Sequence, residues 1–451
     1  MKIEMPENVK NIIKKIRDAG YEAYIVGGCV RDCILGRQPN DWDITTSAKP
    51  EEIKALYRRT IDTGIKHGTV SVMIGNERYE ITTYRIDGMY TDHRRPDDVT
   101  FTSHLSEDLL RRDFTINAMA YNDEEGLVDI YGGMEDIEKK VIRCVGKAND
   151  RFDEDALRIM RAVRFAAQLG FNIEEETYIA GKEHAGDLKN VSAERIETEL
   201  TKLLLSPHPE ELITMYELGI TDVILPEFSL CMETPQNSPY HKYDVGRHTV
   251  EVIKNVPATK IMRYAALLHD IGKPLVKTTD SDGVDHFKTH AVKSEEMAED
   301  ILRRLRMDND TIRDVKIIIL WHDYGISGNI TKKSVRRMLS KMGEEYYESL
   351  IEIKKADMIG QSDFRLEEKK DFLNNFMTLH DEIILEKSPL TMKEMAIGGK
   401  ELIDMGIKPG PEMGSILKKI FDMILDDPDL NVKEKLLDIA KSIVGDIENE
   451  E

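Results

Sequence analysis

Apolar and polar positions follow two different patterns along the chain, and the first pattern predicts a mixture of helices and strands. A helical spacing over Val9–Ala19 precedes a short apolar strand, Ala23–Val26, and a Gly-Gly turn then leads into another helix. Thr69–Ile74 and Arg78–Tyr84 alternate between apolar and polar residues and flank a Gly-Asn turn, which predicts a β-hairpin. The N-terminal part is therefore predicted as α/β, with a mixed sheet and flanking helices.

From about Asp153 onward, the apolar spacing becomes helical and predicts an all-α remainder. The segments ALRIMRAVRFAAQL (156–169) and ERIETELTKLLL (194–205) are strong helix candidates, and Ser192 is a candidate N-cap for the second. Residues 225–244 contain prolines and few periodic positions, which predicts a linker. A second helical unit rich in His and Asp follows at 245–365, and a helical tail completes the chain.

Composition limits the classes of protein that fit. The 451 residues are 41% hydrophobic, which predicts several domains with buried cores. A net charge of −21 argues against a nonspecific nucleic-acid binder, although local arginine clusters could still dock a polyanion. We find no apolar run long enough to span a membrane and no signal peptide. Four cysteines without a CxxC pair predict reduced thiols in a cytoplasmic protein.

Two closely spaced aspartates are the first candidates for chemistry. Asp41 and Asp43 are predicted on a short strand, where a period of two places both carboxylates on one face. Two such carboxylates repel each other unless cations lie between them, as in sites that hold two Mg²⁺ ions for phosphoryl transfer. Glu80 is a candidate third carboxylate if its strand lies beside this one. The alternative is a solvated acidic strand edge.

A turn of two glycines precedes the aspartates. Gly27 and Gly28 follow a predicted strand and precede a helix, so their backbone N–H groups could approach phosphates closely. Arg31, one turn into that helix, could reach the same phosphates.

The order of several motifs resembles a known family, the class II tRNA nucleotidyltransferases and bacterial poly(A) polymerases. The motifs are GGCVRDCILGRQPNDWDITTSAKP (27–50), TGIKHGTVSV (63–72), RRDFTINAMAYN (111–122), EDALRIMRAVRFAAQLGF (154–171) and ERIETEL (194–200). The resemblance implies a small nucleotidyltransferase head followed by helical neck, body and tail. It implies CCA addition to the 3′ end of tRNA from CTP and ATP, with Mg²⁺ at the polymerase site.

The RRD motif then has a chemical interpretation. Arg112 and its neighbour Arg111 offer cations for a triphosphate, and the carboxylate of Asp113 can accept a hydrogen bond from a ribose 2′-OH. Asn117 is a candidate second contact to ribose or phosphate. The alternative is a local cluster of salt bridges.

The Glu-Asp-x-x-Arg motif has the role of a protein template in the resembling family. Asp155 and Arg158, three residues apart on a predicted helix, would share one face and present an acceptor and a forked donor. Cytosine and adenine both offer an amino donor and a ring-nitrogen acceptor, whereas uracil and guanine would present an oxygen to Asp155. Arg161 and Arg164 continue along the helix and could support phosphate or base.

The segment 85–101 bears on which nucleotides the protein would add. Residues 85–101 are rich in Gly, Pro and charge, and in the resembling family an intact loop here accompanies addition of A. An A-adding enzyme or a poly(A) polymerase is the nearest alternative.

The segment LLHDIGKP resembles the HD phosphohydrolase superfamily. The resemblance implies a second, metal-dependent hydrolase site, with a nitrogen and oxygen ligand set suited to a transition metal such as Mn, Ni, Co or Fe. Its candidate ligands are His248, His269, Asp270 and Asp357, with His290 and His322 where two-metal HD domains keep further ligands. An HD phosphohydrolase with a tRNA-binding front half, and a noncatalytic tRNA-binding protein, are alternatives from other classes.

These observations predict four domains. Residues 1–140 form a nucleotidyltransferase head resembling polymerase β, and residues 141–235 form a helical neck and body that bind the nucleotide base and RNA. Residues 236–365 form the HD domain, and residues 366–451 form a helical tail that binds tRNA. The predicted partners are tRNA, CTP and ATP, without a membrane; the sequence leaves the oligomeric state open.

Overall fold

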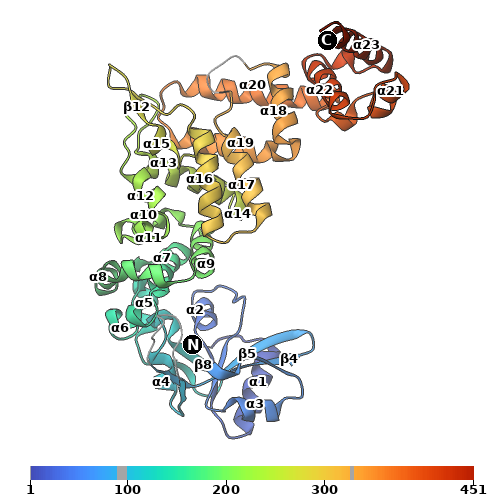
Figure 1. Cartoon of the computed structure of the whole chain (residues 1–451). Helices are drawn as coiled ribbons and strands as arrows, with labels where there is room; N and C mark the ends of the chain where they lie inside the picture. The colour runs from blue at the N-terminus through green and yellow to red at the C-terminus, as the bar shows by residue number, and fades with distance from the viewer. Residues whose placement is uncertain (1, 89–98, 326–329, 451) are drawn as a thin grey trace. The chain divides into compact units, whose positions relative to one another are not determined.

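A computed structural model describes residues 2–88, 99–325 and 330–450 (Figure 1). The chain divides into two compact units, Met1–Leu230 with Ile301–Met307 and Cys231–Asp300 with Asp308–Glu451. The predicted division into four domains stays a prediction. Within the described ranges, none of the helices is both long and apolar enough to cross a membrane.

A seven-stranded mixed sheet lies in the first unit, in the order β3-β4-β5-β2-β1-β8-β9. Only β2 and β5 pair in parallel within this sheet. The strands are β1 (Ala23–Val26), β2 (Ile44–Thr46), β3 (Thr60–Gly64), β4 (Thr69–Ile74), β5 (Glu77–Thr83), β8 (Met119–Asn122) and β9 (Gly126–Asp129). The predicted hairpin is confirmed as β4 and β5, which pair antiparallel across Gly75 and Asn76.

Helices flank this sheet, as the apolar spacing predicts. Helix α1 (Glu7–Asp18) and helix α2 (Gly28–Ile34) contact β1. Helix α4 (Leu105–Leu110) buries Leu105 and Leu109 in a cluster with side chains of β1 and β8. The first unit also contains α3 (Pro50–Leu56) and α5 (Gly133–Lys139).

The segment predicted as a loop begins and ends in short strands. Strand β6 (Arg85–Asp87) pairs antiparallel with β7 (Val99–Phe101). Residues 89–98, the middle of that segment, lie outside the described residues.

The strand predicted at Asp41–Asp43 is wrong, because β2 begins only at Ile44. The neighbouring strand β1 ends at Val26, whose N–H donates to the carbonyl of Asp43 at 3.0 Å. The chain then turns at Gly27, which has φ +82°. Strand β1 therefore has no residue that pairs with Asp41. Residues 41–43 lead into β2 without belonging to it.

Helices follow the sheet in the first unit. Helix α6 (Ala148–Glu154) packs against α8 (Glu175–His184), and α7 (Leu157–Leu169) packs against α9 (Ala193–Leu204). Ser192 occupies the predicted N-cap position of α9, but its side chain makes no capping hydrogen bond. The linker predicted at 225–244 is partly wrong, because α12 (Pro226–Met232) forms within it.

The predicted helix through Asp155 is interrupted at that residue. Asp155 has φ −153°, and it lies between α6 and α7. Its Oδ1 accepts a hydrogen bond from the backbone N–H of Leu157 at 3.2 Å. An aspartate that bonds the backbone in this way competes with the helical hydrogen bonds and favours a helix start. The prediction that Asp155 and Arg158 share one helix is therefore wrong.

The second unit is helical, apart from a small hairpin. Helix α13 packs against α14 and α19, and α14 packs against α17. The bounds are α13 (Val245–Asn255), α14 (Lys260–Leu268), α15 (Lys273–Val276), α16 (His290–Arg304), α17 (Asn309–Trp321) and α19 (Tyr347–Gly360). The hairpin joins β12 (Thr278–Thr279) to β13 (Asp285–His286).

The C-terminal part of the second unit has its own core. Buried residues of α21 (Gly399–Asp404), α22 (Pro411–Asp426) and α23 (Lys433–Glu450) form one hydrophobic cluster. Helix α18 (Lys332–Met342) packs against α20 (Leu366–Leu385) and against α22. The predicted fold class, an α/β sheet part followed by helices, is confirmed.

A buried carboxylate, absent from the predicted site, ties α4 to the sheet. Asp108 is fully buried, accepts from the hydroxyl of Thr45 on β2 at 3.1 Å, and pairs with Arg111 at 2.8 Å and Arg112 at 3.6 Å. Burial disfavours its charge, but the two arginines outweigh burial and lower the pKa of Asp108.

Asp108→Ala is expected to lower the free energy of unfolding at pH 7 by about 3–5 kcal/mol, because it removes the fully buried counter-charge of two partly buried arginines. The depressed pKa means that ionised Asp108 stabilises the fold above its unfolded pKa of about 3.9, and that this contribution is lost as pH falls through the folded pKa. Urea unfolding should therefore show a difference between the wild type and the variant that shrinks below pH 4.

Asp18→Ala provides the control, because Asp18 is exposed and its surface pair with Lys14 should contribute little to stability. A loss in Asp108→Ala that is the same at all pH values would contradict the assigned charge pairing.

Candidate active site and candidate metal centre

The parallel pairing of β2 and β5 brings the three candidate carboxylates to one edge of the head. Ile44 lies opposite Ile81, so Asp43 and Glu80, each one residue earlier, come side by side. Although Asp43 is exposed, surrounding protein hinders its hydration and the negative charges of Glu80 and Asp41 act on it. These effects raise the pKa of Asp43 against the opposing charge of Arg112. Carboxylates whose negative charges act on one another in this way fit a site for hard cations, which would relieve the repulsion.

Arg112 approaches the glycine turn that precedes α2. A Cβ at Gly27 would lie 2.8 Å from Nη1 of Arg112, and Gly27 also has φ +82°. A side chain at Gly27 would therefore strain the backbone and displace the guanidinium. The turn thus holds a cation beside Asp43, while Gly28 begins α2.

Asp113 joins the head to α7. Its Oδ2 accepts from Nε and Nη2 of Arg161 at 2.8 and 2.6 Å, and its Oδ1 accepts from the side chain of Asn117 at 3.2 Å and from the backbone N–H of Phe114 at 2.8 Å. Arg31 donates to Asn117 at 2.6 Å. Burial opposes the charge of Asp113, yet Arg161 lowers the pKa well below its usual range. Both oxygens of Asp113 are therefore already engaged, so a ribose hydroxyl would have to share them.

Three guanidinium groups surround the ring of Phe165 on α7. The distances from their carbons to the ring centroid are 5.0 Å for Arg31, 5.3 Å for Arg161 and 3.5 Å for Arg164. Glu199 of α9 is buried, and it accepts from Nε of Arg164 at 2.8 Å. Like charges packed this closely need such a counter-charge and the π-face of the ring.

Arg161 and four other arginines line a cavity of about 770 Å³. Asp155 and Arg158 both line it, although they do not share one helix. Arg195 of α9 donates to both oxygens of Asp155, at 3.2 and 2.7 Å. Arg158 donates to Glu154 at 2.5 Å and to the carbonyl of Arg111 at 3.1 Å. The cavity is lined by Arg111, Arg112, Asp113, Asp155, Leu157, Arg158, Arg161, Ser192, Glu194, Arg195, Thr198 and Glu199.

Three residues of this site were not among the predicted site residues. Asp108 and Glu199 are buried counter-charges, and Arg195 orients Asp155. Arg195 and Glu199 belong to the segment ERIETEL, which the family resemblance includes as a motif without a role for each residue. Asp108 precedes Arg111 and Arg112 by three and four residues, but its contact with Thr45 on β2 could not be predicted from the local pattern.

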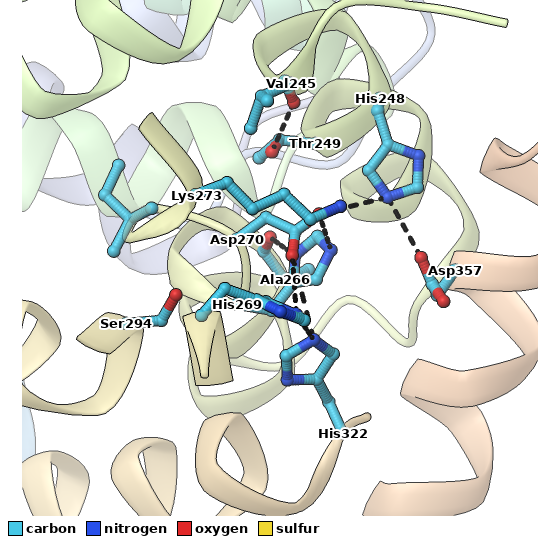
Figure 2. A network of polar contacts seen from close by, with 12 residues as sticks. Val245, His248, Thr249, Ala266, His269, Asp270, Lys273, Ser294, His322 and Asp357 are labelled. Atoms are coloured by element: carbon cyan, nitrogen blue, oxygen red, sulfur yellow. Dashed lines mark hydrogen bonds and ion pairs between the residues drawn. The ribbon is translucent and has the colours of Figure 1, made fainter. Parts of the chain in front are cut away.

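A second cluster of candidate residues lies in the second unit. Figure 2 shows the side chains of His248, His269, His322, Asp270 and Asp357 pointing toward one another. His269 and Asp270 follow α14, and the other three come from separate segments. Nε2 of His248 lies 2.9 Å from Asp357 and 3.5 Å from Asp270, and Nε2 of His269 lies 3.2 Å from Asp270. Two triads could each surround a cation: His248, His269 and Asp357, and His269, Asp270 and His322.

Backbone carbonyls fix the orientation of three imidazole rings in this cluster. Nδ1 of His269 lies 2.8 Å from the carbonyl of Ala266, and Nδ1 of His322 lies 2.6 Å from that of Ile319. Nδ1 of His290 lies 2.8 Å from the carbonyl of Phe287. A ring that donates its Nδ1–H to a carbonyl has a lone pair on Nε2, which is the usual arrangement for metal-binding histidines.

The Nε2 atoms of the cluster face one another and the carboxylates of Asp270 and Asp357. Nε2 of His290 and Nε2 of His322 lie 3.1 Å apart, and with both Nδ1 atoms donating, two lone pairs would meet there. Nδ1 of His248 is buried and has no hydrogen bond to any described residue, while Nε2 of His248 and Nε2 of His269 lie against carboxylates at 2.9 and 3.2 Å. Such buried nitrogen and oxygen atoms fit a transition-metal ion.

A glycine and a lysine lie against the cluster. A Cβ at Gly360 of α19 would lie 2.9 Å from Nδ1 of His248, so a glycine is needed for the close approach. Nζ of Lys273 lies 2.7 Å from Asp270 and donates to Gln236 at 2.9 Å. His286 lies on β13, where it pairs with Asp280 at 2.7 Å.

Models of protein families match most of the chain. A model described as the Poly A polymerase head domain matches residues 23–143. A model described as "Probable RNA and SrmB- binding site of polymerase A" matches residues 170–232. A model of tRNA nucleotidyltransferase domain 2 matches residues 285–440.

Whole-chain relatives carry one name. The CCA-adding enzymes of Levilactobacillus brevis and Leuconostoc mesenteroides are each 36% identical to this chain, and the alignments cover 91% and 96% of both partners. The crystal structure of the Bacillus stearothermophilus CCA-adding enzyme in complex with CTP is similar with a TM-score of 0.72 and 28% identity, covering 99% of this chain and 100% of that one.

Proposed function

We propose a function from one premise: the chain belongs to the family of CCA-adding enzymes. In this proposal it is a nucleotidyltransferase that adds C, C and A to the 3′ end of tRNA, with CTP and ATP as substrates. The observation that carries the proposal is the arginine-rich cavity of about 770 Å³, which holds Asp113, Asp155 and Arg158 between the head and helices α7 and α9.

The chemistry of the cavity supports selection of cytosine and adenine. Asp155 is an acceptor held by Arg195, and Arg158 is a forked donor held by Glu154. An amino group of either base can donate to Asp155 while a ring nitrogen accepts from Arg158. The oxygen of uracil or guanine would face the carboxylate of Asp155, which disfavours those bases.

The acidic edge of the head supports a phosphoryl-transfer step. In that step the tRNA 3′ oxygen forms a bond to the α-phosphorus, the bond to the β-phosphate oxygen breaks, and pyrophosphate leaves while the hydroxyl proton goes to solvent. Mg²⁺ bound at Asp41 and Asp43 would neutralise charge on the triphosphate and activate the hydroxyl. Glu80 adds negative charge beside Asp43, and Arg112 offers a positive charge on the other side.

Poly(A) synthesis is the nearest alternative activity. Poly(A) synthesis uses the same kind of head, and the first family model bears that name, but the relatives that match over most of the chain are named CCA-adding enzymes. We therefore propose CCA addition over A addition or poly(A) synthesis. The cytoplasm stays our predicted location.

Asp41→Ala should abolish nucleotide addition without unfolding the protein, because it removes a cation ligand from an exposed site. Wild-type protein, incubated with Mg²⁺, CTP, ATP and a tRNA that lacks its last three nucleotides, should extend the ends by CCA and stop. Sequencing of the ends measures both outcomes, and Asp62→Ala, an exposed aspartate of β3, is the control that should keep activity. Long A tails in the wild type, or near-normal activity in folded Asp41→Ala, would refute the proposal.

Arg158→Ala should weaken CTP and ATP selection together, because one guanidinium is proposed to meet both bases. Each kcat/KM should fall by a factor that corresponds to about 1–3 kcal/mol, and incorporation of UTP should rise relative to CTP. Single-nucleotide incorporation assays measure this, and Arg59→Ala outside the cavity is the control. A loss confined to one nucleotide would contradict a shared template.

We also propose a second function, a metal-dependent phosphohydrolase, at the histidine and aspartate cluster. The observation that favours it is the set of buried Nε2 atoms that face one another, with their Nδ1 atoms held by carbonyls. His248, His269, Asp270 and Asp357 would hold the ion, and His290 and His322 would complete a second position.

The proposed hydrolysis follows from this donor set. A bound transition metal supplies a water of lowered pKa and neutralises phosphate charge. Water adds to phosphorus, one P–O ester bond breaks, and the leaving oxygen takes up a proton. The ammonium of Lys273 lies at Asp270, where it can face a bound phosphate. We propose phosphomonoesters and 2′,3′-cyclic phosphates at damaged tRNA ends as substrates.

His269→Ala should remove transition-metal binding and phosphohydrolysis. The rate of CCA addition should stay within about two-fold of the wild-type rate, because the proposed transition-metal ligands lie in a different unit from Asp41. Metal content after dialysis against Mn²⁺ or Ni²⁺ gives a readout independent of activity. His208→Ala, an exposed histidine of the first unit, should retain the metal. A wild type that retains no transition metal would refute the metal site, and a folded His269→Ala without CCA addition would refute the independence of the two sites.

A further inference from the structure

The cavity beside the histidine and aspartate cluster is larger than a phosphate group needs. Its volume is about 570 Å³, within the range of about 300–1,000 Å³ that is typical of pockets for whole small molecules. Asp270, Asp357 and His322 line it on the side of the cluster. When the phosphate of a substrate reaches the cluster, the cavity therefore has room for another chemical group of the same molecule. Other residues of the cavity wall indicate which group that is.

An aromatic ring with nearby cations forms another part of the wall. Tyr240 lines the cavity with 39% of its surface exposed, and Phe364 packs edge-on against it with the ring centroids 5.0 Å apart. Nζ of Lys369 lies 5.5 Å from the centroid of the Tyr240 ring, and Arg365 lines the same cavity. Exposed aromatic rings with cations beside them are the usual contact surface for bases of single-stranded nucleic acids.

The backbone holds Tyr240 at a fixed place relative to the cluster. The N–H of Ser362 donates to the carbonyl of Tyr240 at 2.9 Å, and Lys369 donates to the carbonyl of Ser362 at 3.2 Å. The adjacent Gln361 donates to Asp357 at 2.8 Å. The aromatic ring is thus tied through one short segment to a proposed metal ligand.

Between the ring and the cluster lies a polar group without a partner. Nδ1 of His241 is buried and makes no hydrogen bond to any described residue. The imidazole of His241 packs edge-on against that of His248, with centroids 5.8 Å apart, and His241 also lines the cavity. A buried nitrogen in this position calls for a hydrogen-bonding group of the ligand.

We infer that Tyr240 is a stacking platform for a nucleobase, so that the site takes the terminal nucleotide of an RNA strand rather than a bare phosphoester. This inference rests on the proposed hydrolase function of the same cavity. The phosphate lies at the cluster, a ribose oxygen accepts a hydrogen bond from Nδ1 of His241, and the base stacks on Tyr240. Lys369 and Arg365 then meet the phosphate of the preceding nucleotide.

Paired substrates test the platform, because both carry a five-membered cyclic phosphate and only one of them carries a nucleoside. Adenosine 2′,3′-cyclic phosphate is compared with glycerol 1,2-cyclic phosphate, using full-length protein loaded with Mn²⁺. The wild type should prefer the nucleotide, and Tyr240→Ala should reduce the ratio of the two kcat/KM values by about 5- to 100-fold, mainly through KM for the nucleotide. Tyr240→Phe should keep the ratio, and so should Tyr243→Ala in the same segment.

Other results would overturn the inference. It fails if the wild type shows no preference for the nucleotide, or if Tyr240→Ala lowers both activities equally, as a merely structural role would. If the wild type hydrolyses neither substrate, the hydrolase proposal fails, and calorimetry decides the platform separately. Adenosine 2′-monophosphate should then bind at two places on the wild type, the arginine-rich cavity and the platform, and at one on Tyr240→Ala; equal stoichiometry would refute the platform.

Discussion

The ion pair between Asp113 and Arg161 is the interaction on which the first site depends. It joins the segment after α4 to helix α7 with two hydrogen bonds of 2.8 and 2.6 Å. Asp113 is 8% exposed, and loss of one partner would leave a buried charge uncompensated, which is far more costly than loss of a surface pair. The position of Asn117, and through it that of Arg31, follows from the same carboxylate.

This pair also explains how a protein with a net charge of −21 gathers arginines at one cavity. Arg31, Arg161 and Arg164 repel one another around the ring of Phe165. Each of them has a carboxylate as counter-charge, which is Asp32, Asp113 and Glu199 in that order. The excess of acidic residues elsewhere leaves the field of the cavity local. A local field suits an anionic substrate bound at one place rather than indiscriminate binding of polyanions.

The sequence was a good guide to elements with a clear period, and a poorer guide to residues that act at their ends. Helix α7 and the hairpin of β4 and β5 match their apolar spacing closely, because burial of one face decides them. Asp43 and Asp155 were placed in regular elements, yet both lie just outside one. Asp155 bonds the backbone at the start of α7, and Asp43 lies where the partner strand ends. Arg195 was missed because its partner Asp155 lies 40 residues away, and no local pattern reveals a long-range ion pair. Asp108 was missed although Arg111 and Arg112 follow it closely, because its contact with Thr45 spans 63 residues.

The two candidate sites hold their charges in opposite ways, and this difference follows from the atoms that each presents. At the edge of the head, Asp41 and Asp43 are exposed oxygen donors, which suit a hard ion that retains part of its hydration. In the second unit, His269 and Asp270 are almost fully buried, and imidazole nitrogens dominate the donor set. Burial of unpartnered nitrogen is costly unless an ion replaces the lost water, and nitrogen ligands favour transition metals over Mg²⁺. On our proposal, the nitrogen-rich donor set of the second unit favours a transition metal, whereas the exposed carboxylates of the first unit suit a hard ion such as Mg²⁺, so the two donor sets differ in the ion that they prefer.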